Sequence, residues 1–147
     1  MGTLSSLMSL VHVVGFALAA GSATVKLSLL LRCRNDIDFL PSYLRVVRPI
    51  TWLIVTGMIL LLLSGGTWLF LGHEFSPRLI VKLVLFVAVS IIGPVIDNVF
   101  EPRYRKLAPV SGAPISPEFL RAQRHYLTME ITATLLFYVI AAIWMLG

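Results

Sequence analysis

Five ionisable side chains stand inside long apolar stretches of this sequence, and they are the residues that could do chemistry. They are His12, Lys26, Lys82, Asp97 and Glu130. Charged and polar groups are costly in apolar surroundings, so each of them needs a partner or marks a functional site. A neutral imidazole can also bind the iron of a haem or a copper ion, which makes His12 the first candidate ligand.

The composition predicts that these residues lie in a membrane. Hydrophobic residues fill 58% of the 147 positions, charged residues fill only 13%, and the mean hydropathy is +0.91. So little charge is not typical of a soluble domain of this size. Four spans with their loops use nearly the whole length, so we predict one all-α domain over residues 1–147, an integral membrane four-helix bundle.

Charge-poor stretches mark the spans and serines mark two of the helix starts. The predicted spans cover approximately residues 4–31, 49–72, 77–98 and 119–146. Ser76 and Ser116 each precede a proline, an arrangement typical of the first turn of a helix. The segment 39–49 either lies along the membrane interface or extends the second span inward.

Basic residues predict the orientation of the bundle. Arginine and lysine gather in the loops at 32–48 and 100–124, whereas the turn between the second and third spans has only Arg78 at its edge, and both chain ends have none. By the positive-inside rule, the two basic loops face the cytoplasm and both termini lie on the outer, periplasmic side. We therefore expect a multi-pass protein of the bacterial inner membrane.

The first span has a stripe of small residues that predicts which way it faces. His12, Gly15, Ala19, Ser22 and Lys26 follow a spacing of three and four residues, so they lie on one face of a helix. Small residues allow helices to approach closely in lipid, and therefore His12 and Lys26 should point into the bundle. Small residues of the second span should permit close packing in the same way; they are Gly57, Ser64, Gly65 and Gly66.

Depth divides the five ionisable residues into two groups. His12 and Lys82 lie in the outer half, Lys82 about 7 Å inside the start of its span at 1.5 Å per residue. Lys26, Asp97 and Glu130 lie near the inner face, where we expect a structural ionic cluster. Two simpler interpretations remain open: His12 forms a hydrogen bond with a neighbouring helix, and Lys82 extends to the surface.

A b-type haem is the cofactor that the outer group fits best, because the core of a four-helix bundle can hold one. His12 would be an axial ligand and Lys82 a second ligand or the partner of a propionate. His125 lies about 15 to 20 Å deeper than His12, and His73 would reach the same iron only if the outer turn folded inward. Copper, the alternative, prefers more histidine or methionine than this region offers.

Three segments of the chain resemble a known superfamily. They are "LVHVVGFALAAG" at 10–21, "PITWLIVTGMILLLLSG" at 49–65 and "SPRLIVKLVLFVAV" at 76–89. They look like the superfamily that joins the membrane domain of the copper-resistance protein CopD with the HemJ-type bacterial protoporphyrinogen oxidase, and that also includes small four-helix bacterial membrane proteins. The likeness covers roughly the first 95 residues.

The resemblance implies a redox function at the outer pair. In the HemJ-type branch a histidine and a lysine at these motif positions are associated with b-type haem, and by position they are His12 and Lys82 here. That branch oxidises protoporphyrinogen and passes electrons to the respiratory chain. This sequence differs in reading "IIGPVIDN" where those enzymes carry a Tyr-His pair, and "RHYLTME" where they carry an Asn-Glu feature.

The sequence thus predicts a membrane redox protein that binds b-type haem in the outer half of the bundle, for electron transfer or protoporphyrinogen-oxidase-like activity. Its partners would be the lipid bilayer, a tetrapyrrole substrate or a respiratory electron partner, and further copies or subunits in a larger complex. The alternatives are a non-catalytic accessory or assembly subunit and a copper-handling CopD-like protein. Nothing in the sequence indicates nucleic-acid binding.

Overall fold

The computed structural model describes residues 2–70, 76–110 and 114–145, and the elements in these ranges are all helical. The elements are α1 (Gly2–Asn35), η1 (Ile37–Phe39), α2 (Leu40–Phe70), α3 (Pro77–Val95), η2 (Ile96–Phe100), α4 (Glu101–Lys106) and α5 (Pro117–Met145). In these described ranges, four helical stretches are long and apolar enough to cross a membrane. The prediction of an all-α four-helix bundle is confirmed at this level.

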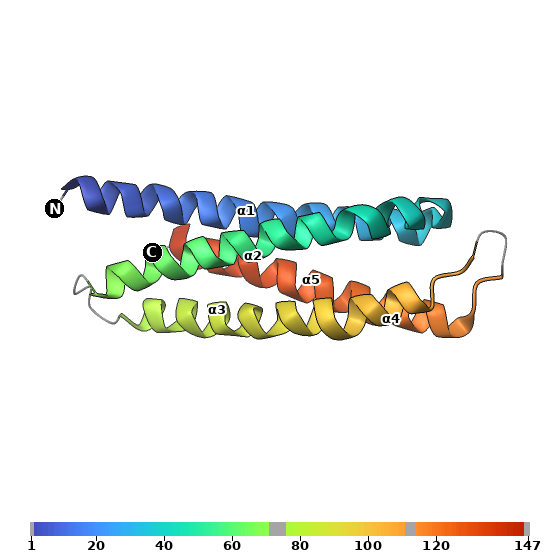
Figure 1. Cartoon of the computed structure of the whole chain (residues 1–147). Helices are drawn as coiled ribbons and strands as arrows, with labels where there is room; N and C mark the ends of the chain where they lie inside the picture. The colour runs from blue at the N-terminus through green and yellow to red at the C-terminus, as the bar shows by residue number, and fades with distance from the viewer. Residues whose placement is uncertain (1, 71–75, 111–113, 146–147) are drawn as a thin grey trace.

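The four long stretches run antiparallel, side by side (Figure 1). The start of α1, the end of α2, the start of α3 and the end of α5 lie at one end, and the end of α1, the start of α2, α4 and the start of α5 lie at the other. Helix α1 packs most extensively against α2, and α5 packs against both α1 and α3. Helices α2 and α3 do not pack closely on each other, and a groove lies between them.

The helices are longer than the predicted spans. Helix α1 continues to Asn35, α2 begins at Leu40 instead of Pro49, and the third stretch continues through α4 to Lys106. Charged residues end an apolar run without ending a helix, because arginine and lysine are good helix formers. Of the two interpretations of segment 39–49, the extension of the second helix beyond Pro49 is the one observed, since α2 begins at Leu40 and has Pro49 inside it.

The two predicted helix starts are confirmed. The backbone N–H of Leu79 donates to the hydroxyl oxygen of Ser76 at 3.2 Å, and the backbone N–H of Phe119 donates to that of Ser116 at 3.1 Å. Each bond satisfies one of the donors that a helix leaves unpaired at its first turn.

Glycine at position 57 sets the distance between α1 and α2. A Cβ atom on Gly57 would lie 2.5 Å from the backbone nitrogen of Ala19 and 2.6 Å from the carbonyl oxygen of Gly15. Backbone cannot yield as a flexible side chain can, so any larger residue would push the two helices apart. The predicted close packing therefore holds for Gly57, whereas a Cβ on Gly66 would meet nothing within 4 Å.

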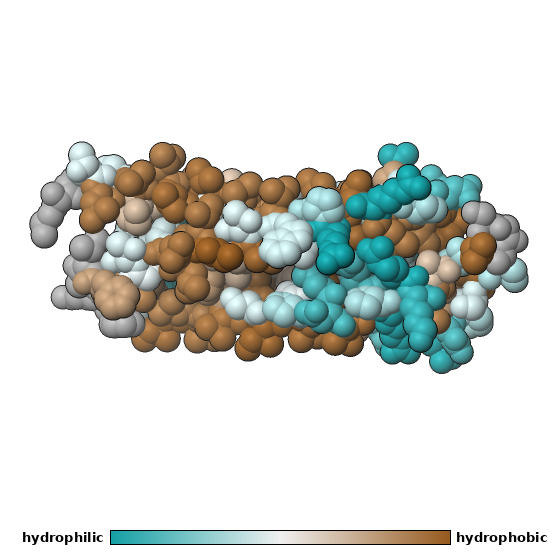
Figure 2. Space-filling view, in the orientation of Figure 1, coloured by the Kyte–Doolittle hydropathy of each residue, from teal (hydrophilic) through white to brown (hydrophobic). Residues whose placement is uncertain are grey.

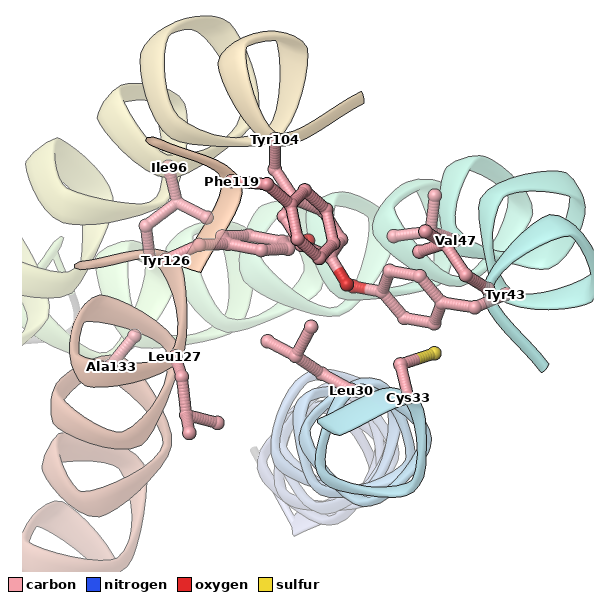
Figure 3. Close-up of a cluster of buried hydrophobic side chains, with 11 residues drawn as sticks. Leu30, Cys33, Tyr43, Val47, Ile96, Tyr104, Phe119, Tyr126, Leu127 and Ala133 are labelled. Atoms are coloured by element: carbon pink, nitrogen blue, oxygen red, sulfur yellow. The ribbon is translucent and has the colours of Figure 1, made fainter. Parts of the chain in front are cut away.

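The two ends of the bundle differ in their chemistry. Hydrophilic residues gather at the end that holds α4, while hydrophobic residues cover most of the rest of the visible face (Figure 2). Inside the hydrophilic end lies an aromatic core in which the hydroxyls of Tyr43 and Tyr126 are 2.6 Å apart, with the rings of Tyr104 and Phe119 stacked beside them (Figure 3). This core joins α2, α4 and α5 next to the buried charges.

Replacement of Gly57 by alanine should destabilise the protein strongly, because the new methyl group overlaps the backbone of α1. We expect a loss of about 1 to 3 kcal/mol in the free energy of unfolding, measured by denaturation in mild detergent. Gly66→Ala is the matched control, which should leave stability unchanged or raise it by up to about 1 kcal/mol through helix propensity. Equal effects of the two substitutions would contradict the tight crossing at Gly57.

Candidate functional site

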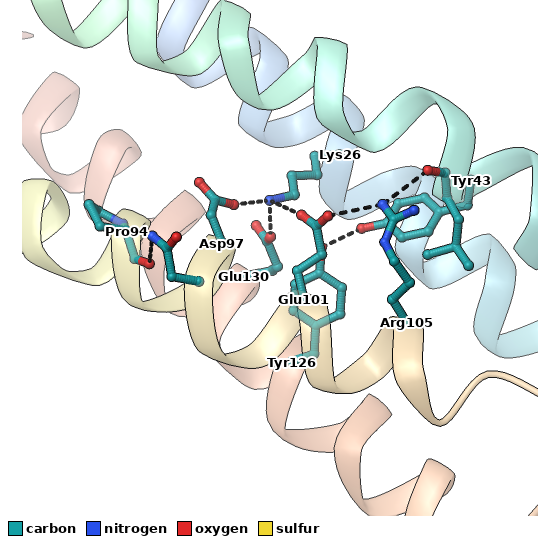
Figure 4. Close-up of polar contacts among 10 residues, drawn as sticks. Lys26, Tyr43, Pro94, Asp97, Glu101, Arg105, Tyr126 and Glu130 are labelled. Atoms are coloured by element: carbon teal, nitrogen blue, oxygen red, sulfur yellow. Dashed lines mark hydrogen bonds and ion pairs between the residues drawn. The ribbon is translucent and has the colours of Figure 1, made fainter.

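The ammonium of Lys26 is the centre of a buried ionic network (Figure 4). Its Nζ lies 2.8 Å from Oδ1 of Asp97, 2.7 Å from Oε1 of Glu130 and 3.9 Å from Oε2 of Glu101. The Lys26 side chain is only 2% exposed, and its ammonium also lies 5.8 Å from the centre of the Tyr126 ring. The three residues that the sequence grouped by depth are therefore in contact, and they tie α1, η2 and α5 together.

Glu101 is the member of the network that the sequence reasoning missed. Its Oε1 accepts a hydrogen bond from Nη2 of Arg105 at 3.2 Å, and the same guanidinium nitrogen donates to the carbonyl of Leu44 at 3.1 Å. Arg105 is 45% exposed, so it links the buried charges to the hydrophilic end. A signal for Glu101 existed in the sequence, because it follows Asp97 by four residues and so lies on the same helix face.

A change of helix type positions Asp97. Pro94 has no N–H to donate to the carbonyl of Ser90, and a π-helical turn over Ile96–Phe100 follows directly. Asn98 donates through its side-chain nitrogen to the carbonyl of Pro94 at 2.7 Å, which supports the interrupted turn. Single π-turns within helices occur frequently at functional sites. A proline inside a helix commonly produces a kink or a local break, and here the break has the form of a π-turn.

The network has more negative than positive groups. Three carboxylates, on Asp97, Glu101 and Glu130, face the two cations of Lys26 and Arg105. Arg105 is paired with Glu101, so Lys26 is left with two carboxylates at 2.8 Å and 2.7 Å. The Glu130 side chain is 4% exposed and that of Asp97 is 27% exposed, so part of the surplus negative charge is buried, and a further cation would stabilise it.

A groove between α2 and α3 leads to this network. It has a volume of about 250 Å³, and its walls are almost entirely apolar. Lys26, Asp97 and Glu130 all line it. Other lining residues are themselves exposed on the surface of the bundle, namely Val55, Ile59, Leu62, Ser90 and Pro94. The groove is therefore open sideways, toward the lipid in a membrane, and has its charged groups at depth.

His12 occupies a different place, in the interface of α1 with α2. Its Nδ1 lies 2.9 Å from the hydroxyl of Ser64, and its ring is stacked on Trp68 with 6.1 Å between centres and 12° between planes. The Ser64 hydroxyl donates its single hydrogen to the carbonyl of Leu60 at 2.7 Å. In the tautomer that carries its hydrogen on Nδ1, His12 donates to this oxygen, and the lone pair of the neutral imidazole is then on Nε2.

This arrangement fits one requirement of a haem ligand and leaves another unmet. A histidine that ligates a metal through Nε2 commonly donates its Nδ1–H to a second group, and Ser64 stands at 2.9 Å from Nδ1 of His12 in a position to accept it. Lys82 is half-buried on α3, close enough for its charge to act on His12. The α2–α3 groove and the second cavity described below are not lined by His12. The chain thus supplies a ligand, and the haem ring would lie outside the α2–α3 groove.

The structure gives no support for a metal ligand at the other two histidines or for the copper alternative in the described residues. His73 lies outside the described residues, and His125 is exposed on α5. Within the described ranges, no three side chains of histidine, cysteine, aspartate or glutamate gather as a metal site would require. A single copy therefore supplies no observation that favours copper.

Replacement of Lys26 by methionine should cost far more stability than replacement of Arg105 by glutamine. Lys26→Met leaves two close carboxylates without their cation, and we expect the free energy of unfolding to fall by about 3 to 5 kcal/mol. Arg105→Gln removes a half-exposed pair and should cost less than about 1 kcal/mol. Thermal and denaturant unfolding in detergent would measure both, and a Lys26→Met protein as stable as the wild type would contradict the buried network.

Comparison of the chain with known proteins identified no relative. No family model, no curated protein and no solved structure matches the chain. The functional proposals below therefore rest on the residues of this chain and on their geometry.

Proposed function

We propose that this membrane protein binds, within the bilayer, a small lipophilic molecule that has a basic head group. The observation that carries the proposal is a lipid-facing groove with Lys26 and two carboxylates at its depth. An apolar pocket with a few convergent polar groups is the usual form of a small-molecule site. Ionisable residues inside a membrane are rare and commonly mark a binding site or pathway.

The groups at the base of the groove favour a cationic head group. Oε1 of Glu130 is 2.7 Å from Lys26 Nζ, and because a carboxylate oxygen has more than one lone pair it keeps capacity to accept a further hydrogen bond. The carbonyl oxygen of Ser90 does not receive the usual helical hydrogen bond, because Pro94 has no backbone N–H. A ligand ammonium has three donors and would neutralise the surplus carboxylate. A carboxylate or phosphate head would instead meet Asp97 and Glu130.

The orientation belongs to the same proposal. We place the hydrophilic end of the bundle in the cytoplasm and the two termini outside, in the inner membrane of a bacterium. Arginine and lysine in the connections at that end support this orientation through the positive-inside rule. The ligand would then enter sideways from the lipid and place its head group in the half of the membrane nearer the cytoplasm.

Three probes that share an eight-carbon chain test the preference for a cation. We expect octylammonium to bind the purified protein about tenfold more tightly than octanol or octanoate, a difference of about 1.4 kcal/mol. Isothermal titration in a non-ionic detergent would measure the three dissociation constants. Equal binding of the three probes would show mere partitioning into the detergent and the apolar surface.

Two substitutions and a control locate the probe. A Cβ on Gly93 would meet nothing within 4 Å, so Gly93→Leu fills the groove without disturbing the packing and should abolish the preference. Glu130→Gln removes the surplus charge and should bring octylammonium to the level of octanol. Glu118→Gln, on an exposed carboxylate at the start of α5, should change nothing. Unchanged octylammonium binding by Gly93→Leu would contradict the proposal even if Glu130→Gln failed to fold.

We propose a redox function at His12 as a second candidate, supported by the contact of its Nδ1 with the Ser64 hydroxyl at 2.9 Å, which leaves Nε2 for a metal. His12 would be an axial ligand of b-type haem, with Lys82 as a second ligand or propionate partner. The haem would supply electron transfer or porphyrinogen oxidation, with a respiratory electron partner. We expect the haem to lie between two copies, since His12 does not line the α2–α3 groove.

The visible spectrum of the purified protein tests the haem candidate. We expect a Soret band that is lost in His12→Ala, retained in His125→Ala, and accompanied by about one haem per two chains. A colourless protein after expression with ample haem would contradict haem binding. If octylammonium also showed no preference, the accessory-subunit alternative would be favoured, and metal analysis would then test copper.

A further inference from the structure

A second cavity lies at the hydrophilic end, between the end of α1 and the first half of α5. Its volume is about 570 Å³. It is lined by two arginines, two further polar residues and three apolar residues, namely Arg34, Arg124, Gln123, Thr128, Leu120, Leu127 and Ile131. None of these residues belongs to the Lys26 network or to the surroundings of His12. Neither proposal above uses this cavity.

The two arginines of this cavity have no acidic partner within the described part of the chain. Both side chains are exposed, and neither Arg34 nor Arg124 forms an ion pair there with an aspartate or glutamate. Arg34 precedes Asp36 by two residues, but Asp36 uses a carboxylate oxygen to accept from the backbone N–H of Asp38 at 3.1 Å. Two guanidinium groups thus line one cavity with their donors available.

Along α5, a charged residue of the cavity is followed by apolar residues nearer the middle of the span, as the charged head group of a phospholipid is followed by its acyl chains. Arg124 lies toward the hydrophilic end, and Leu127, Thr128 and Ile131 follow it toward the middle of the span. Ile131 is about 10 Å deeper than Arg124 at 1.5 Å per residue. A phosphate held at the arginines would therefore have an acyl chain alongside the apolar residues. A free phosphate or an acidic peptide would use the charged part only.

We propose that this cavity binds one anionic phospholipid, with its phosphate at Arg34 and Arg124 and the first part of an acyl chain along α5. Arginine matches phosphate geometry through paired N–H donors. Basic pockets between membrane helices are known to take anionic lipid head groups. A zwitterionic lipid also has a phosphate, but its own ammonium compensates that charge. The site should therefore distinguish phosphatidylglycerol from phosphatidylcholine with the same acyl chains.

Native mass spectrometry of the protein released from mixed lipid and detergent micelles tests this site. We expect the wild-type protein to retain phosphatidylglycerol about thirtyfold better than phosphatidylcholine, as two arginines at a membrane surface predict. The double variant Arg34→Gln, Arg124→Gln should lose most of that preference. The matched control is Arg45→Gln, Arg103→Gln, which removes the same charge from two other exposed arginines and should keep the preference.

A further variant separates the cavity from general charge effects. Thr128 is exposed and lines the cavity, so Thr128→Trp fills the space without removing an arginine and should also reduce retention of phosphatidylglycerol. Equal retention of the two lipids by the wild type would overturn the proposal. So would an equal loss in both double variants, because the preference would then belong to the whole basic end. Binding of octylammonium in the α2–α3 groove should be the same in all these variants.

Discussion

A lysine ammonium that is almost completely buried determines how this bundle is assembled. Lys26 must be paired where it lies, and its two nearest partners come from η2 and α5. Those contacts draw three of the four helical stretches together around one point. Helix α2 takes no part in them and packs instead on α1 through Gly57. The separation of α2 from α3, and so the groove that reaches the charges, follows from these two sets of contacts.

The interrupted helix around Pro94 makes the network possible. The π-turn over Ile96–Phe100 adds a residue to the turn, which alters the direction of the side chains that follow Pro94. Asp97 meets Lys26 from this turn, and Glu101 and Arg105 continue the network toward the hydrophilic end. An uninterrupted helix would place the same residues at other angles. A local break in regular structure thus coincides with the densest group of charges in the described chain.

The sequence predicted the features that depend on composition and spacing. The four spans, the caps at Ser76 and Ser116, and the common depth of Lys26 with its two acidic partners all follow from runs, periods and helix rise. The continuation of α1 to Asn35 and of the third stretch to Lys106 was not predicted, because the spans follow charge-poor runs, whereas the extension of the second span was one of two interpretations. The unequal roles of Gly57 and Gly66 were also missed, since both are small residues in one span and only interhelical distance separates them.

The groove could not be predicted from the sequence. It exists because α2 and α3 do not pack closely, and the spacing of residues along each helix does not indicate the distance between the two helices. His12 is the opposite case: the stripe of small residues placed it inside the bundle, and its bond to Ser64 is one of the two interpretations that the sequence left open. Whether its free nitrogen holds a metal stays a prediction. The sequence therefore grouped the polar residues by depth, and only the structure shows that a groove between α2 and α3 opens sideways from the Lys26 network.

Contact between a bound amine and the carboxylates of Asp97 and Glu130 is the central claim, and dipolar recoupling by solid-state nuclear magnetic resonance measures it directly. The sample would be the protein in bilayers, with ¹³C in its carboxylates and ¹⁵N in octylammonium. We predict a coupling that corresponds to a separation of about 4 Å or less, the range of an ion pair, and its loss in Gly93→Leu. A probe nitrogen that couples to lipid phosphates and to neither carboxylate would contradict the claim.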